Sequence, residues 1–142
     1  MKKVSRFHAM LMVAVLAVGT AATLRADHGG NNNNQTRLRT KLAGGAIQGK
    51  TPEGNAEFRM DAKGRTSFKV EVENVNLPAG TVLDVTLTDA GTPTVVGHIT
   101  LNAFGEGELE LQSQDGDTVP AVVKGDIVTV LNAGSPILSG TF

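Results

Sequence analysis

The sequence predicts an all-β protein, namely an antiparallel β-sandwich, or a partly closed barrel, of about eight strands. From Arg37 onward, apolar and polar residues alternate with a period of two, which is typical of strands that bury one face. No segment after residue 26 keeps apolar residues three and four apart over three turns, as an amphipathic helix would. Glycine occurs 17 times, and motifs such as PAG, DAG, DGD and NAG favour tight turns between strands.

The expected strands follow one another at short, regular spacing. The first begins at Arg37, where RLRTKL alternates cations with Leu38, Thr40 and Leu42. NAEFRMDA alternates in the same way, and DAKGR turns the chain into TSFKVEVENV. Five further strands are expected in TVLDVTLT, TVVGHITL, GELELQ, DIVTVL and PILSGTF, the last of which contains Phe142. Eight short strands separated by turns predict a sandwich or barrel.

Two of these segments share a pattern. AGTPTVVGHI and AGSPILSGTF, which end at Ile99 and Phe142, both read Ala-Gly-hydroxyl-Pro, three residues, Gly, any residue, apolar residue. We expect two equivalent hairpins, with each proline at an edge or a strand start, where its missing N–H does no harm. The equivalence places Ile99 and Phe142 in the core, and His98 and Thr141 on the outside.

The first 26 residues are predicted to be a secretory signal peptide. Lys2, Lys3 and Arg6 precede the uncharged run AMLMVAVLAVGTAATL, and small residues precede a polar segment. Cleavage is expected after Ala26, with Ala22 as an equally defensible site. An uncleaved membrane anchor is the alternative, although the run is shorter than the ~20 residues that a spanning helix prefers.

The remaining chain divides into a tail and one domain. Residues 27–36, DHGGNNNNQT, form a polar low-complexity segment that cannot bury apolar surface and is expected to be disordered. Residues 37–142 are long enough for a single β-sandwich domain.

Charge and composition disfavour several function classes. After residue 26 the chain has nine Lys or Arg against 14 acids, and from Glu71 onward one lysine stands against ten acids. Nucleic-acid binding needs a basic surface with stacking aromatics, so this distribution argues against it. Tyrosine and tryptophan are absent, which weakens sugar recognition by ring stacking. Cysteine is absent as well, so the chain has neither disulfides nor a lipid-anchored cysteine.

Several segments resemble a known group of proteins. NLPAGTVLDVTL, GHITLNAFGEGELEL, QDGDTVPAVVKGDIVTVL and ILSGTF are together similar to uncharacterised bacterial secreted β-domains, over roughly residues 42–142. That resemblance implies a fold and export, and no activity. LAGG and GNAEFRMDAKGRTSFKVEVENVNL are more loosely similar to the CHRD domain of chordin. CHRD domains have a His-x-His after the last of these strands, where this chain has PAGTVLDV, so any role of those histidines does not transfer.

SQDGDTVPAVVKGD contains the first candidate metal ligands, Asp115 and Asp117. An EF-type calcium loop needs oxygen ligands at alternate positions and a distal glutamate, but Val119 occupies the next alternate position. Asp-Gly is also a strong turn former. We therefore expect a connection between strands, with weak surface calcium binding as the alternative.

Glu106, Glu108 and Glu110 are the second candidate ligands, because they line one face of a predicted strand. Such a row can attract a divalent cation or a basic partner, and it can equally be a solvated face that prevents edge-to-edge aggregation. Arg37, Arg39 and Lys41 are the expected partners for this row across a sheet. His98 has no second histidine or cysteine with which to form a transition-metal site or a nucleophilic dyad.

The sequence therefore predicts a small secreted or periplasmic β-domain without catalytic residues or cofactor. Its expected role is structural or adhesive, with an unidentified component of the cell envelope or extracellular matrix as partner, no nucleic acid, and no membrane span after cleavage. The alternative is an extracellular module that binds calcium or a polysaccharide.

Overall fold

The computed structural model describes residues 35–142, so the predicted signal peptide and most of the predicted tail lie outside the described residues. Eight strands follow in sequence: β1 (Thr36–Ala43), β2 (Glu53–Met60), β3 (Thr66–Glu73), β4 (Val82–Asp89), β5 (Thr92–Thr100), β6 (Gly107–Gln112), β7 (Ile127–Asn132) and β8 (Ser135–Thr141). The 3-10 turn η1 (Ser113–Asp115) follows β6. In residues 35–142, no helix is long and apolar enough to cross a membrane.

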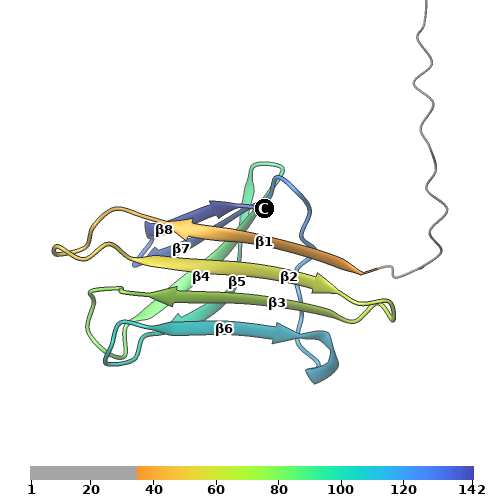
Figure 1. Ribbon diagram of the computed structural model, residues 1–142, viewed down its shortest axis with the longest axis horizontal. Helices are drawn as coiled ribbons and strands as arrows, with labels where there is room; N and C mark the ends of the chain where they lie inside the picture. The colour runs from red at the N-terminus through yellow and green to blue at the C-terminus, as the bar shows by residue number, and fades with distance from the viewer. Residues whose placement is uncertain (1–34) are drawn as a thin grey trace, which may run out of the picture. The chain divides into compact units, whose positions relative to one another are not determined.

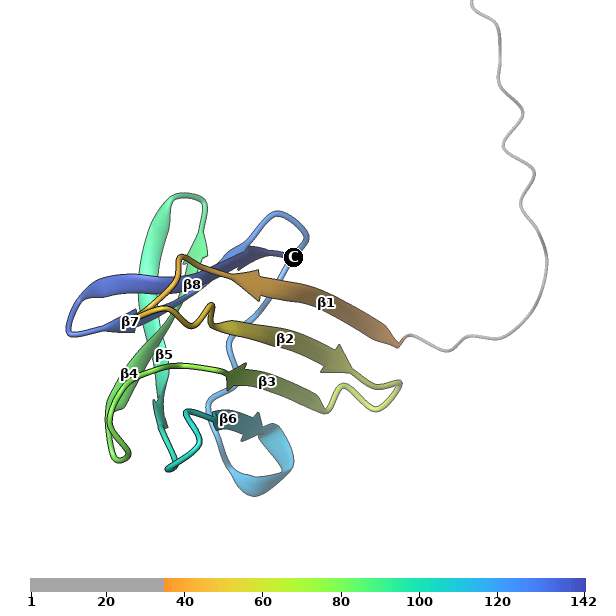
Figure 2. The same ribbon diagram turned by 60° about the vertical axis from the view of Figure 1, so that its left-hand side comes forward.

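The strands form one antiparallel sheet in the order β5-β4-β7-β8-β1-β2-β3-β6. The sheet folds over into two halves of four strands. Figure 1 shows β4 and β5 crossing behind β1, β2 and β3, and Figure 2 shows them to the left of β1, β2, β3 and β6. The predicted all-β fold of about eight antiparallel strands is therefore confirmed.

The two halves meet at a corner between β8 and β1. Only one residue pair, Ala43 with Ser139, joins these strands in the ladder. Gly44 follows β1 so closely against β8 that a Cβ built on it would lie 1.8 Å from the carbonyl oxygen of Ile137. Glycine at this position lets the two backbones touch where the sheet changes direction.

The outermost strands, β5 and β6, approach each other without a hydrogen-bonded ladder. A Cβ on Gly97 of β5 would lie 2.7 Å from the Leu109 side chain of β6, and one on Gly107 would lie 2.5 Å from Cγ2 of Ile99. The sheet therefore nearly closes into a barrel, with a seam of glycines and apolar side chains between its two ends.

The core lies between the two halves, and valine, leucine and isoleucine dominate it, as the composition predicts. Along β2, β3, β4 and β7 its buried members alternate with exposed or half-buried residues. Phe104 is not among them, because 80 % of its surface is exposed in the turn after β5. The buried apolar residues are Leu42, Ala56, Phe58, Phe68, Val70, Val72, Val75, Leu83, Val85, Leu87, Ile99, Leu101, Val122, Val128, Val130 and Leu138.

The two hairpins with the shared sequence pattern, β4–β5 and β7–β8, have the same turn, but a β-bulge interrupts their ladders at different places, after Val85 in the first and after Val130 in the second. Their turns are built on Ala90-Gly91 and Ala133-Gly134, and all four residues have positive φ, between 47° and 85°. Two central residues of positive φ define the turn whose twist suits a two-residue hairpin. Each hairpin then contains one β-bulge, and each second strand has its proline at the second residue.

The predicted orientation of the hairpin ends is confirmed with one adjustment. Ile99 is buried, while His98 and Thr141 are exposed. Phe142, expected in the last strand and in the core, lies one residue beyond β8 and is half-buried. Its ring packs against that of Phe68 at a centroid distance of 6.4 Å, and its N–H donates to the carbonyl oxygen of Asp126 at 2.9 Å. At the other end, β1 begins at Thr36, a residue earlier than expected.

Candidate functional site

The outer surface of β1, β2, β3 and β6 carries most of the charged side chains of the strands, and we call it the charged face. Period-two alternation turns one side of each strand outward, because the opposite side packs in the core. The outward residues are Arg37, Arg39 and Lys41 on β1; Glu53, Asn55, Glu57 and Arg59 on β2; Ser67, Lys69, Glu71 and Glu73 on β3; and Glu108, Glu110 and Gln112 on β6.

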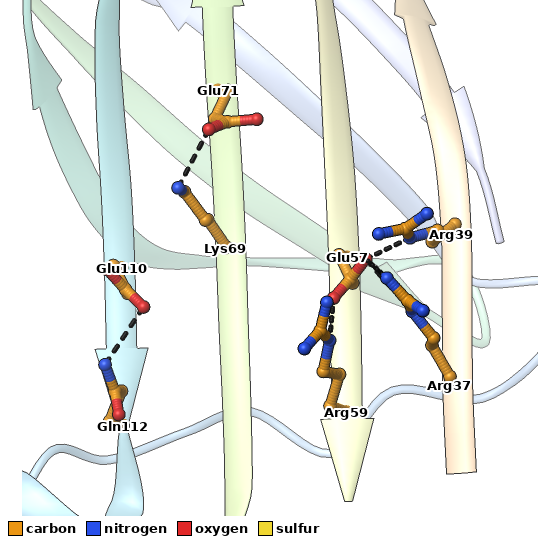
Figure 3. A network of polar contacts seen from close by, with 8 residues as sticks. All are labelled: Arg37, Arg39, Glu57, Arg59, Lys69, Glu71, Glu110 and Gln112. Carbon is orange, nitrogen blue, oxygen red and sulfur yellow. Dashed lines mark hydrogen bonds and ion pairs between the residues drawn. The ribbon is translucent and has the colours of Figure 1, made fainter.

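The charged face is basic along β1 and acidic along β6. Its basic end is centred on Glu57, which lies opposite Arg39 in the β1–β2 ladder. The Glu57 carboxylate accepts hydrogen bonds from Arg37 at 3.0 and 3.2 Å, and it also pairs with Arg39 and Arg59 (Figure 3). Arg37 and Arg59 lie directly opposite each other, so Glu57 also relieves the repulsion of a like-charge cross-strand pair.

The three guanidinium groups cover the carboxylate that binds them. The side chains of Arg37, Arg39 and Arg59 are 50, 62 and 55 % exposed, whereas that of Glu57 is only 19 % exposed. Burial acts to raise the pKa of Glu57, but the hydrogen bonds from Arg59 and Arg39 outweigh it, so the pKa is lowered. Glu57 is therefore held ionised, and the arginines form the outer layer.

The acidic end has the reverse arrangement around Lys69. Glu71 and Glu108 lie directly opposite each other in the β3–β6 ladder. The Nζ atom of Lys69 bridges them, at 2.8 Å from Glu71 and 3.2 Å from Glu108. Hydrogen bonds to Glu71 and then to Glu108 raise the pKa of Lys69. One cation thus stabilises two carboxylates that would otherwise repel each other.

A shallow groove of about 570 Å³ crosses the face above β1, β2 and β3. Ala56 is the one apolar residue in its lining, which consists of Arg39, Thr40, Lys41, Asn55, Ala56, Glu57, Arg59, Lys69 and Glu71. A second depression, of about 310 Å³, lies at the acidic end and is lined by Glu71, Val72, Glu73, Asn102, Glu106, Gly107 and Glu108.

Of the three glutamates predicted to line one face of a strand, two lie in β6 and one lies before it. Glu108 and Glu110 share the outer side of β6, and Glu110 accepts a hydrogen bond from Gln112 at 2.9 Å (Figure 3). Glu106 precedes β6 and belongs to a turn, where the Asn102 side chain accepts from its N–H at 3.0 Å and donates to its carboxylate at 3.2 Å.

The expected pairing of the β1 cations with this row is wrong. β2 and β3 separate β1 from β6 in the sheet, and the arginines of β1 bind Glu57 on the adjacent strand instead. Lys69 supplies the positive charge next to the row.

Asp115 and Asp117 form a turn, as expected. Asp115 ends η1, and Gly116 follows with a φ of 89°. A carboxylate oxygen of Asp117 accepts from the N–H of Gln112 at 2.9 Å, which closes the turn back onto the end of β6. Across residues 35–142 no group of three or more His, Cys, Asp or Glu side chains is arranged to hold a metal ion.

Asp126, the third acid of the same stretch, has a structural role that sequence reasoning missed. It is the one buried charged residue of the described chain, at 4 % exposure. Its carboxylate accepts from the N–H of Val123 at 2.9 Å, and its carbonyl accepts from Phe142. Asp126 therefore stabilises the turn that precedes β7 through its side chain and binds the C-terminal residue through its backbone. In the sequence, the Gly125-Asp126 pair just before the strand indicates a turn in which the aspartate side chain can accept a backbone hydrogen bond.

His98 has one charged partner, which sequence reasoning also missed. Its Nδ1 atom lies 2.8 Å from a carboxylate oxygen of Asp84, directly opposite on β4. Both side chains are exposed, at 61 and 43 %. With Asp89, at the exposed hairpin end of β4, they are the only titratable side chains of β4, β5, β7 and β8, where Thr86, Thr129 and other hydroxyl or aliphatic residues dominate the outer side.

Comparison with protein-family models and with curated proteins gives no match to the chain. The similarity to secreted bacterial β-domains and to CHRD domains therefore stays a prediction, and the functional argument depends on the charged face.

Proposed function

We propose that this chain is an exported, non-catalytic β-domain with a structural or adhesive role in the cell envelope or extracellular matrix, and that the charged face is its contact surface. The observation that carries the proposal is the unequal distribution of charge over the fold. The outer surface of one half is densely charged and grooved, while the strands of the other half have only Asp84, Asp89 and His98 as titratable residues. Such a surface is suited to holding a partner by complementary charge.

The state of the charged groups supports a role other than acid–base chemistry. A general acid at neutral pH needs a carboxyl group with a raised pKa. The pKa of Glu57 is lowered instead, because arginines surround it. The N-terminal sequence supports export, since its basic start, apolar run and small residues are those of a signal peptide.

Cell fractionation of the full chain expressed in a bacterium tests the proposal. The expected product is found in the envelope or the medium, has the mass of a chain that begins at Asp27, and is retained on isolated envelope material at low salt. A cytoplasmic product that keeps residues 1–26 and binds no envelope material would overturn it.

A calcium titration separates this proposal from the calcium-binding alternative. A site with a micromolar dissociation constant would stabilise the fold by ~4 kcal/mol at millimolar calcium. We expect no change in melting temperature, because the carboxylate of Asp117 accepts a backbone hydrogen bond and that of Glu108 is paired with Lys69. A rise of several degrees that a chelator reverses would favour the calcium module.

A further inference from the structure

We propose that the basic end of the charged face binds an acidic polysaccharide, which lies along β1 and is held through its carboxylate or sulfate groups. This inference rests on the proposed function and names the ligand class for the contact surface. The groups involved are Arg37, Arg39, Lys41 and Arg59.

The arginines have donors to spare. A guanidinium group carries five N–H donors, so three groups carry about fifteen. Glu57 accepts four hydrogen bonds from them. The side chains of the three arginines are at least 50 % exposed, so a ligand in solution can reach the donors that Glu57 does not use. Because three cations share one carboxylate, the cluster keeps a net positive charge and can accept a second anion.

The cations of β1 are arranged in a line. Arg37, Arg39 and Lys41 point to the same side at every second residue, which gives intervals of about 7 Å along the strand. Arg59 lies beside Arg37, and Asn55 lies beside Lys41. Lys41 has no ion-pair partner among residues 35–142. A line of cations on an open face matches a linear ligand that carries anionic groups at intervals.

The lining of the groove favours a sugar chain over an acidic peptide. Protein partners are usually anchored by a few apolar or aromatic side chains in desolvated pockets. The one apolar residue in the lining of the groove is Ala56, which is itself buried in the core, and the rest of the lining is charged or polar. Asn55, on the outer side of β2, can bind hydroxyl groups between the anionic ones. Since the chain has no tyrosine or tryptophan for ring stacking, charge supplies most of the affinity, and binding should depend steeply on salt.

The acidic end of the face limits where the ligand can lie without preventing its binding. β6 is three strands away from β1, or about 14 Å at the usual strand spacing. Electrostatic interactions are screened over about 8 Å at physiological ionic strength. A polyanion along β1 is therefore shielded from Glu108 and Glu110, whereas one that crossed the strands would meet them.

Binding of defined polyanions to the mature chain tests the inference. The probes are polygalacturonate for carboxylates and dextran sulfate for sulfates, with neutral dextran as the blank. We expect one or both polyanions to bind at physiological ionic strength and to dissociate as more salt is added. Arg39→Gln and Arg59→Gln should each weaken binding about three- to tenfold. The matched control, Lys124→Gln, removes one positive charge from the exposed loop before β7 and should leave binding unchanged.

Glu57→Gln makes the test specific to the cluster. It removes the internal carboxylate that competes for the arginines, so it should strengthen binding about three- to tenfold while slightly lowering the denaturation midpoint. Weaker binding by this variant, or an equal loss with Lys124→Gln, would overturn the inference. Polyglutamate bound as tightly as polygalacturonate would also overturn it, in favour of an acidic protein segment. Retention on envelope material without binding to either polyanion would refute the inference and leave the proposed function standing. Loss of both would refute both.

Discussion

Thr86 of β4 lies directly opposite Thr129 of β7, and a local two-fold relation between the two hairpins passes through this pair. Each residue of the first hairpin has its counterpart 43 positions later, so that Asp84 opposite His98 corresponds to Ile127 opposite Thr141. The pairing of β4 with β7 has the same symmetry. Thr88 lies opposite Ile127, and their counterparts, Leu131 and Asp84, also lie opposite each other. The repeated sequence pattern is therefore a repeated structure, except that the bulge of the second hairpin lies two residues nearer the turn than that of the first.

The alanines of the two hairpin turns should be replaceable with a gain in stability. Ala90 and Ala133 have φ of 47° and 48°, a conformation that costs an ordinary L-residue about 1 kcal/mol and that asparagine tolerates better. Ala90→Asn and Ala133→Asn should each raise the free energy of unfolding by about 0.5–1 kcal/mol in chemical denaturation. Ala103→Asn, in the exposed turn after β5, is the control and should change it little. A loss of stability in both variants would show that the turns differ from those described.

The corner between β8 and β1 should tolerate no side chain at Gly44. A methyl group there would collide with the backbone of Ile137, whereas one on Gly45 meets nothing within 4 Å. Overpacking against backbone typically costs ~1–3 kcal/mol. We therefore expect Gly44→Ala to lower the unfolding free energy by at least that much, and Gly45→Ala to change it by no more than ~0.5 kcal/mol. Equal effects of the two substitutions would show that the halves are not in contact at this corner.

The chain end should contribute to stability while His98 should not. Phe142 is half-buried against Phe68, so Phe142→Ala should cost about 2 kcal/mol, below the ~3–5 kcal/mol of a fully buried phenylalanine. The ion pair of His98 with Asp84 is exposed, and His98→Ala should change stability by no more than ~0.5 kcal/mol. Urea denaturation of both variants measures these changes in the free energy of unfolding. A neutral Phe142→Ala would mean that the end of the chain is frayed.

Acid should remove the contribution of Glu57. Its folded-state pKa lies below the ordinary value of 4.5, so the stabilisation is complete above that value and is lost as the pH falls through the lowered pKa. The denaturation midpoint of the parent chain should therefore fall on acidification below about pH 4.5, and Glu57→Gln should fall less steeply. Glu73→Gln, on the same face, provides the comparison. Identical slopes for the parent and Glu57→Gln would exclude a net contribution from this carboxylate.

Alternation alone predicts the strands well, because each strand buries one side. The start of β1 was misplaced by a residue, since Thr36 continues the pairing with Met60 without changing the apolar pattern. The partner of His98 could not be found in this way. Counting pairs outward from the Ala90-Gly91 turn places Leu83 opposite His98, and the bulge between Val85 and Thr86 shifts the register to Asp84.

The charged face depends on strand order, which alternation does not specify. The acidic row and the β1 cations have complementary charges, yet two strands separate them. The pairing of Arg39 with Glu57 needs the β1–β2 register, and the segment from Gly44 to Pro52 is too long for turn chemistry to fix it. Within β2, the two-residue spacing of Glu57 and Arg59 indicates that both side chains lie on the same side of the strand, so this ion pair could have been predicted from the sequence.

The symmetry of the β4–β7 pairing also affects how the chain can misassemble. β4 could pair with the β4 strand of a second molecule in place of β7, because both have the same alternation of apolar and polar residues. In such an antiparallel pair Thr86 would lie opposite Thr86, and Val85 of one copy would lie opposite Leu87 of the other on the apolar side. Until β7 pairs with it, one edge of β4 has unpaired backbone groups. Pairing with β7 requires the chain to close a long loop that includes β5 and β6. Refolding yield should therefore decrease as protein concentration rises, with dimers forming through β4, whereas a yield independent of concentration would show that β7 docks before chains meet.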